Sequence, residues 1–121
     1  MRRLRVSAVL VLTFACANPT GPTGSLTVRR TATALELTNH GAVPAYYFVI
    51  EQGALAFTDW VPSVCAGCPA VSAGRTITIA DTAIVGYFPG AKRAFVYWWL
   101  SVPGPADAPQ PDSVRTIAVD L

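Results

Sequence analysis

Apolar residues recur at every second position in three segments of this chain, and that period of two most constrains its fold. The segments are TALELTN (33–39), RTITIA (75–80) and SVRTIAVDL (113–121). Two others, AYYFVIE (45–51) and RAFVYWWLS (93–101), are β-branched and aromatic on both faces, as central strands are. From residue 25 onward no segment has the spacing of an amphipathic helix. The chain is therefore predicted to be all-β.

Turn-forming residues separate these segments, among them Asn39, Gly41, Pro44 and Gly74. A short strand at residues 27–28 and another at ALAFTDW (54–60) bring the expected number to about seven. The Pro-rich stretch VPGPADAPQP (102–111) is expected to be a loop. This number and spacing favour an antiparallel two-sheet sandwich, and a small closed barrel is the alternative.

The segments LELTNHGAVPAYYFVIE, AGRTITI and AFVYWWL together resemble an immunoglobulin-like or fibronectin-III-like β-sandwich. The chain is also similar to small bacterial lipoproteins that carry such a domain. The resemblance covers most of residues 25–121 and implies the fold. It implies no functional residue, because a sandwich by itself determines no activity.

The N-terminal residues have the pattern of an export signal. Three arginines at positions 2, 3 and 5 precede an uncharged run of ten residues, 6–15, which is too short to span a bilayer. The sequence LTFAC (12–16) resembles a bacterial lipobox, which implies a signal peptide at 1–15 and a lipid on Cys16. Residues 16–24 (CANPTGPTG) are expected to form a flexible linker, and 25–121 the folded domain. The alternative is ordinary secretion, with Cys16 incidental.

The charge of the chain is consistent with this division. The whole sequence carries nine basic and seven acidic residues, a net charge of +2. Without the three signal arginines the balance is six against seven, or −1. Nothing in such a domain favours nucleic acid as a partner. The expected location is the cell envelope, with the protein anchored by its lipid. By analogy with the lipoproteins that the sequence resembles, Ala17 after the cysteine implies the outer membrane.

Cys65 and Cys68 form a C-x-x-C pair, which in an exported protein is expected to be oxidised to a disulfide. A loop this small contributes only about 2 kcal/mol by the chain-entropy argument. A redox role would need a helix N-terminus within a βαβ unit, and a zinc site would need four ligands. The pair is therefore predicted to be structural, and no metal or cofactor is expected.

No residues form a recognisable catalytic set. His40 is the single histidine and is predicted to be a solvated turn residue. Ser63, Ser72 and Ser101 lack the glycines of a nucleophile elbow. The seven acidic residues are scattered, and Glu51 is expected to point outward. The chain is therefore predicted not to be an enzyme.

The aromatic residues are the candidate binding groups. Segments 46–48 and 97–99 are expected to lie on neighbouring strands, where adjacent side chains point to opposite faces. Only one of Trp98 and Trp99 can then enter the core. If Tyr47 and Trp98 share the outer face, they form a flat aromatic surface suited to a protein or a sugar. The alternative is that loops cover this face, or that its rings pack on one another.

These observations lead to a functional hypothesis: a membrane-anchored envelope protein that binds a partner and performs no chemistry. The first candidate is a protein-interaction module, for instance a subunit of an envelope assembly. The second is a module that binds carbohydrate or peptidoglycan through exposed aromatic residues.

Overall fold

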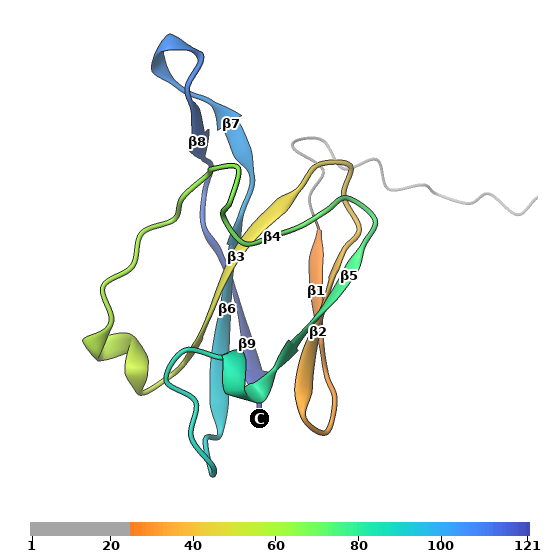
Figure 1. Cartoon of the computed structure of the whole chain (residues 1–121), viewed down its shortest axis with the longest axis vertical. Coiled ribbons are helices and arrows are strands. Elements are labelled where there is room, and N and C mark those ends of the chain that lie inside the picture. Colours follow the sequence, from red (N-terminus) through yellow and green to blue (C-terminus); the bar gives the residue numbers. More distant parts are fainter. Residues whose placement is uncertain (1–24) are drawn as a thin grey trace, which may run out of the picture.

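The computed structural model describes residues 25–121, which form strands and three short 3₁₀ helices (Figure 1). The predicted signal peptide (1–15), Cys16 and the linker (16–24) lie outside the described residues. The elements are β1 (Leu26–Arg30), β2 (Ala34–Asn39), β3 (Ala45–Glu51), η1 (Ala54–Phe57), β4 (Ala70–Val71), β5 (Thr76–Ala80), η2 (Asp81–Ala83), β6 (Arg93–Trp99), β7 (Ser101–Pro103), η3 (Pro105–Asp107), β8 (Pro109–Pro111) and β9 (Arg115–Asp120).

The strands form two larger sheets and one small hairpin. One sheet has the order β1-β2-β5, the second β4-β3-β6-β9, and β7 pairs with β8. Every strand pairing is antiparallel. The prediction of an all-β antiparallel domain is confirmed. A closed barrel is wrong for the described strands, because the two larger sheets are separate and no ladder joins one to the other.

The two larger sheets are separate in Figure 1, and buried side chains from both belong to one hydrophobic core. Leu35 and Leu37 of β2 contribute from the three-stranded sheet, and Val49 and Val96 contribute from the four-stranded sheet. All four have 5% or less of their surface exposed. Their spacing of two residues within β2 is the alternation seen in the sequence, so each strand buries one face against the opposite sheet.

The buried side-chain amide of Asn39 connects one end of the three-stranded sheet to the four-stranded sheet. Asn39 is fully buried at the end of β2. Its Nδ2 donates to the carbonyl oxygens of Val43 and Val71, at 2.8 and 2.9 Å, and its Oδ1 accepts from the Gly41 N–H at 2.8 Å. These bonds satisfy a polar group that would otherwise be costly to bury. They also hold the turn between β2 and β3 against β4.

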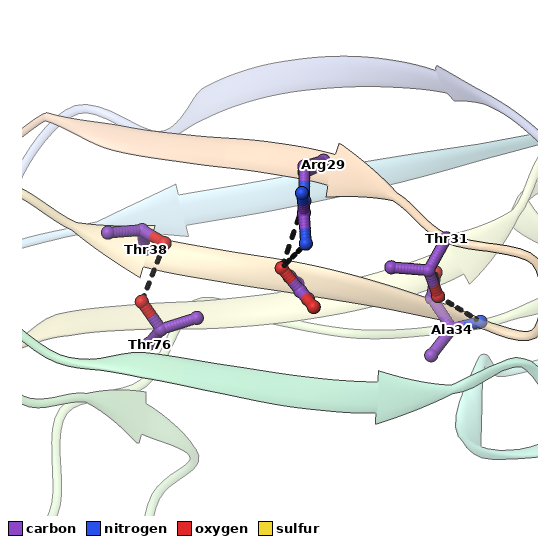
Figure 2. A network of polar contacts seen from close by, with 6 residues as sticks. Arg29, Thr31, Ala34, Thr38 and Thr76 are labelled. Carbon is purple, nitrogen blue, oxygen red and sulfur yellow. Dashed lines mark hydrogen bonds and ion pairs between the residues drawn. The ribbon is translucent and has the colours of Figure 1, made fainter.

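The outer face of the three-stranded sheet is polar (Figure 2). Arg29 donates from Nη2 to the Glu36 carboxylate at 2.8 Å, and the hydroxyls of Thr38 and Thr76 lie 2.8 Å apart. Both pairs join side chains of neighbouring strands. This face therefore needs no covering layer, and its residues explain the polar half of the alternating pattern.

Two segments differ from their predicted structure. ALAFTDW was expected to be a strand, but it forms η1 and an extended loop, with no ladder partner among the described strands. The strand prediction for this segment rested on its apolar composition. A short apolar run does not by itself distinguish a strand from a turn. The Pro-rich stretch 102–111 was expected to be a loop, but it contains the β7–β8 hairpin, closed by η3 with Ala106 and Asp107 at positive φ.

One ion pair connects the two outer strands of the three-stranded sheet. Arg30, at the end of β1, donates to the Asp81 carboxylate, directly after β5, from its two terminal guanidinium nitrogens; the Nη2–Oδ2 distance is 2.9 Å. Arg30 Nη1 also donates to the Ala34 carbonyl of the central strand. The hydrogen bond from Arg30 holds the pKa of the Asp81 carboxyl below its usual value, and the same bond raises the pKa of Arg30.

This ion pair predicts a specific acid dependence of stability. Because the pKa of Asp81 is lowered in the folded state, its contribution is complete above the unfolded pKa of about 3.9 and is lost as pH falls through the folded value. At pH 7, Asp81→Asn should lower the free energy of unfolding by about 2 kcal/mol. Urea unfolding from pH 7 to pH 2 should show this difference disappearing at the acid end. Asp120→Asn is the control, because its pair with Arg93 is exposed, and it should follow the wild-type curve. Parallel curves for wild type and Asp81→Asn would contradict the assignment.

Candidate interaction surface

The register between β3 and β6 decides which aromatic side chains enter the core. Tyr47 lies opposite Trp98, and Tyr46 lies opposite Trp99. Trp98 is 5% exposed and belongs to the core, with Tyr47 packed against it. The expectation that Tyr47 and Trp98 form an outer surface is therefore wrong. Burial also raises the pKa of the Tyr47 hydroxyl.

The ring of Trp98 also packs against a cationic side chain. The Arg115 guanidinium lies 4.5 Å from the centre of the Trp98 ring. Arg115 is the cross-strand partner of Trp98 on β9, and Asp112 holds its Nη2 at 3.0 Å. The carboxylate of Asp112 also accepts from the Leu100 N–H at 2.8 Å. Arg115 and Asp112 thus cover the Trp98 side of the core beside β9.

The outer face of the four-stranded sheet carries the other set of rings, which we call the outer aromatic cluster: Phe48, Trp60, Tyr97 and Trp99. Trp60 lies at its centre, with its ring centre 4.9 Å from Phe48, 4.7 Å from Tyr97 and 6.1 Å from Trp99. Phe48 and Tyr97 are cross-strand partners on β3 and β6. Trp60 comes instead from the loop between β3 and β4, so this loop covers the sheet.

That loop, residues 52–69, is held at several points. The Trp99 indole N–H donates to the Ser63 carbonyl at 3.0 Å. Trp99 is consequently only 4% exposed although it lies on the outer face. A disulfide joins Cys65 and Cys68, as the sequence predicted, with their Cα atoms 5.1 Å apart. The 52–69 loop is thus tied to the sheet by a hydrogen bond and stiffened locally by a covalent bridge.

The beginning of the 52–69 loop is held by a buried carboxylate. Glu51 was expected to point outward, but it is buried, and its Oε2 accepts from the Ala54 N–H at 3.0 Å. Gly86 lies against Ala54, at a positive φ of 75°. A Cβ at position 86 would come within 2.2 Å of the Ala54 Cβ, so only glycine fits there. Together, Glu51 and Gly86 position η1.

Two large apolar side chains on this loop point into solvent. Phe57, the last residue of η1, is 91% exposed, and Val61 is 77% exposed. They flank Trp60, which is packed on the sheet. Phe57 has the highest exposed fraction among the large apolar side chains of the described residues, and aromatic side chains are frequent in binding hot spots. Phe57 and Val61, which we call the loop tip, are the candidate binding residues.

A concave feature lies between β3 and β5. A cleft of about 600 Å³ opens between these strands, with Val49, Ile79 and Val85 among its lining residues. A smaller cavity of about 200 Å³ adjoins it beneath the disulfide, next to Trp99. Neither has a charged residue in its lining. Both are lined mainly by apolar residues.

The remaining residues singled out in the sequence are structural or isolated. His40 is exposed in the turn after β2, where its Nε2 lies 2.8 Å from the Thr27 hydroxyl. Among residues 25–121 no three His, Cys, Asp or Glu side chains gather in a way that could hold a metal ion. Within the same residues no helix is long and apolar enough to cross a bilayer.

No protein-family model, curated protein or solved structure matches the chain.

The importance of Trp60 can be tested against a neighbouring aromatic residue. Trp60→Ala removes the three ring contacts of the outer aromatic cluster and should lower the free energy of unfolding by about 2 to 3 kcal/mol. Phe57→Ala, in the same loop, should change it by less than about 0.5 kcal/mol, because Phe57 is almost fully exposed. Chemical unfolding of both variants measures the difference. Equal losses of unfolding free energy in the two variants would mean that Trp60 does not anchor the loop to the sheet.

Proposed function

We propose that this chain is an exported envelope protein, anchored by a lipid on Cys16, whose β domain binds a partner protein and catalyses no reaction. The support for export and anchoring lies in the sequence: the arginines at 2, 3 and 5, the apolar run 6–15 and the lipobox-like LTFAC. The support for binding lies in the exposed loop tip, Phe57 and Val61.

We further propose that the domain is an immunoglobulin-like sandwich of the fibronectin-III kind. The strand order supports this. If β1, β2, β3, β5, β6 and β9 correspond to strands A, B, C, E, F and G, the sheets are A-B-E and C-F-G. In the constant-type immunoglobulin fold, a strand between C and E pairs with E. Here β4 occupies that place in the chain but pairs with β3, which makes the sheets three- and four-stranded.

The observation that carries the binding proposal is the exposure of Phe57, at 91%, on a loop whose neighbouring Trp60 is stacked on the sheet. A binding residue on an ordered loop loses little conformational entropy when a partner arrives, so more of its buried area becomes affinity. Phe57 and Val61 thus have two properties of a small hot spot, because both are apolar and both lie on an anchored loop.

The place of the loop tip in the fold favours a protein partner over the anchoring membrane. In Figure 1, η1 lies at the lower left and the start of β1 lies right of centre at about mid-height, on the other side of the four-stranded sheet. A lipid on Cys16 would be attached beyond the start of β1, through a linker of nine residues that spans at most about 30 Å. The loop tip would then lie on the side of the domain away from its point of attachment.

A glycan-binding module is the alternative. It would need ring faces free to stack on sugars, and in the outer aromatic cluster these faces are occupied by Trp60. Trp98, the residue first considered for stacking, lies in the core. No feature of the described residues favours a glycan over a protein partner.

Site-specific photocrosslinking tests the proposal in the cells that make the protein. A photoreactive phenylalanine analogue at position 57 or 61 should form an adduct with the same protein, of one defined mass. The analogue at Thr116, which is exposed on β9, is the control and should not form it. The adduct should be lost when Val61→Ser is combined with the analogue at 57.

Other outcomes would contradict the proposal. Adducts that shift with muramidase or glycosidase treatment would favour the glycan alternative, and equal adducts at 57 and 116 would mean that the loop tip is no specific surface. In the same cells Cys16→Ser should move the protein out of the membrane fraction. Retention of that variant in the membrane would overturn the lipid anchor without affecting the crosslinking result.

A further inference from the structure

The edge of β3 forms one wall of the cleft of about 600 Å³ between β3 and β5. Tyr47, Phe48 and Val49 all line this cleft. Because neighbouring side chains of a strand point to opposite faces, three consecutive residues can line one cleft only where the cleft runs along the edge of the strand. The backbone groups on this edge of β3 are therefore part of the cleft wall.

Hydrogen bonds show which backbone groups of β3 point toward the cleft. The Tyr47 N–H donates to the Pro69 carbonyl at 3.3 Å, and the Glu51 N–H donates to the Val85 carbonyl at 2.9 Å. The Val85 N–H donates in turn to the Val49 carbonyl at 3.2 Å. Both Pro69 and Val85 line the cleft, so residues 47, 49 and 51 direct their N–H and C=O groups to this side of β3.

Two of these backbone groups, which we call the β3 slot, have no hydrogen-bond partner among residues 25–121: the Tyr47 C=O and the Val49 N–H. Pro69 lies opposite Tyr47 and accepts its N–H, but a proline has no N–H to donate to the Tyr47 carbonyl. The chain before Val85 turns away from β3 in η2 and cannot reach the slot. An unpaired donor and an unpaired acceptor thus lie side by side in the wall of an apolar cleft.

Val85 shows what such a slot holds. It pairs with Ile50 in a parallel bridge, in which its N–H donates to the carbonyl of Val49 and its C=O accepts from the N–H of Glu51. The β3 slot offers the same two groups, with the same spacing, one step earlier on the strand. It can therefore take the N–H and the C=O of one amino-acid residue. A free amine or carboxylate would bring a charge into a cleft that has no charged residue in its lining, so both ends of that residue must be neutral.

We propose that this cleft binds a small ligand built around one N-acylated, neutral, apolar amino acid. Its N–H donates to the Tyr47 carbonyl, its C=O accepts from the Val49 N–H, and its acyl part packs against Ile79 across the cleft. The volume is that of a small-molecule pocket, which is mostly apolar and has a few fixed polar groups. Pro69 and Val85 occupy the edge of β3 on either side of the slot, so a long strand cannot pair there. The inference does not depend on the partner protein proposed for the loop tip.

The smaller cavity gives the ligand its side-chain preference. A residue paired opposite Phe48 in the parallel mode directs its side chain to the same face of the sheet as Phe48. The cavity of about 200 Å³ lies on this face and is lined by Phe48, Pro69 and Trp99, among others. Its lining has no charged residue. An aliphatic side chain such as that of leucine should therefore bind better than none.

A titration of the full-length, ¹⁵N-labelled protein with N-acetyl-leucine N-methylamide tests the proposal by NMR. Binding should move the Val49 amide proton signal downfield and slow its exchange with solvent, because that N–H acquires an acceptor. The matched control ligand carries an ester oxygen in place of the leucine N–H. It cannot donate to the Tyr47 carbonyl and should bind about tenfold more weakly. N-acetyl-glycine N-methylamide, which has no side chain, should also bind more weakly.

A pair of variants locates the binding site. Ala83 lines the cleft and is exposed, so Ala83→Phe places a ring in the cleft without disturbing the core and should abolish binding. Thr82, the preceding residue of η2, is exposed but does not line this cleft, so Thr82→Phe is the control and should bind like wild type.

Each alternative outcome overturns the proposal. Equal affinity for the amide and the ester would mean that the cleft takes any apolar molecule. Binding that survives Ala83→Phe would place the ligand elsewhere, and a Val49 signal that does not move would mean that the β3 slot is not a binding site. A long apolar peptide that shifts the Thr76 and Thr78 amide signals, while the small amide shifts none, would mean that the cleft region takes a strand on β5 instead.

Discussion

The pairing of β3 with β6 is the constraint on which the rest of this structure depends. Both strands are apolar on both faces, so neither face of their sheet can be left in water. Their register places Tyr47 and Trp98 on one side and Phe48, Tyr97 and Trp99 on the other. The inner side is covered by the three-stranded sheet. The outer side requires a cover of its own, which the 52–69 loop supplies.

This outer cover explains features that otherwise look unrelated. Trp60 fills the centre of the outer aromatic cluster, the Ser63 carbonyl satisfies the indole of Trp99, and Glu51 with Gly86 positions the beginning of the loop. A loop fastened at these points has little freedom to turn its other side chains inward. Phe57 and Val61 consequently remain exposed to solvent. The candidate interaction surface is therefore a consequence of the way the 52–69 loop covers the sheet.

The sequence was sufficient for the longer strands and insufficient for the 52–69 loop and the short strands β4, β7 and β8. Alternation in 33–39 and 75–80 identified β2 and β5, and the double-sided apolar runs identified β3 and β6 as neighbours. The sequence could not decide which of Trp98 and Trp99 enters the core, because a shift of one residue in strand register exchanges the two faces of the strand. Trp60 was missed as a covering residue, since its partners come from strands far away in the sequence. The stretch 54–60 was mistaken for a strand because its composition is apolar. The prolines and cysteines of 62–69, which indicate a long ordered loop, were the one signal that pointed to it.

The described residues thus form an antiparallel β domain with two aromatic layers, one in the core and one under a loop. The central claim of this account is that the 52–69 loop is closed over the outer face. Hydrogen exchange of the indole N–H groups of Trp60 and Trp99, followed by NMR, tests it most directly. The account predicts that the Trp99 indole, bonded to Ser63, exchanges at least ten times more slowly than that of Trp60. A Trp99 indole that exchanges as fast as that of Trp60 would mean that the loop is open and would contradict the account.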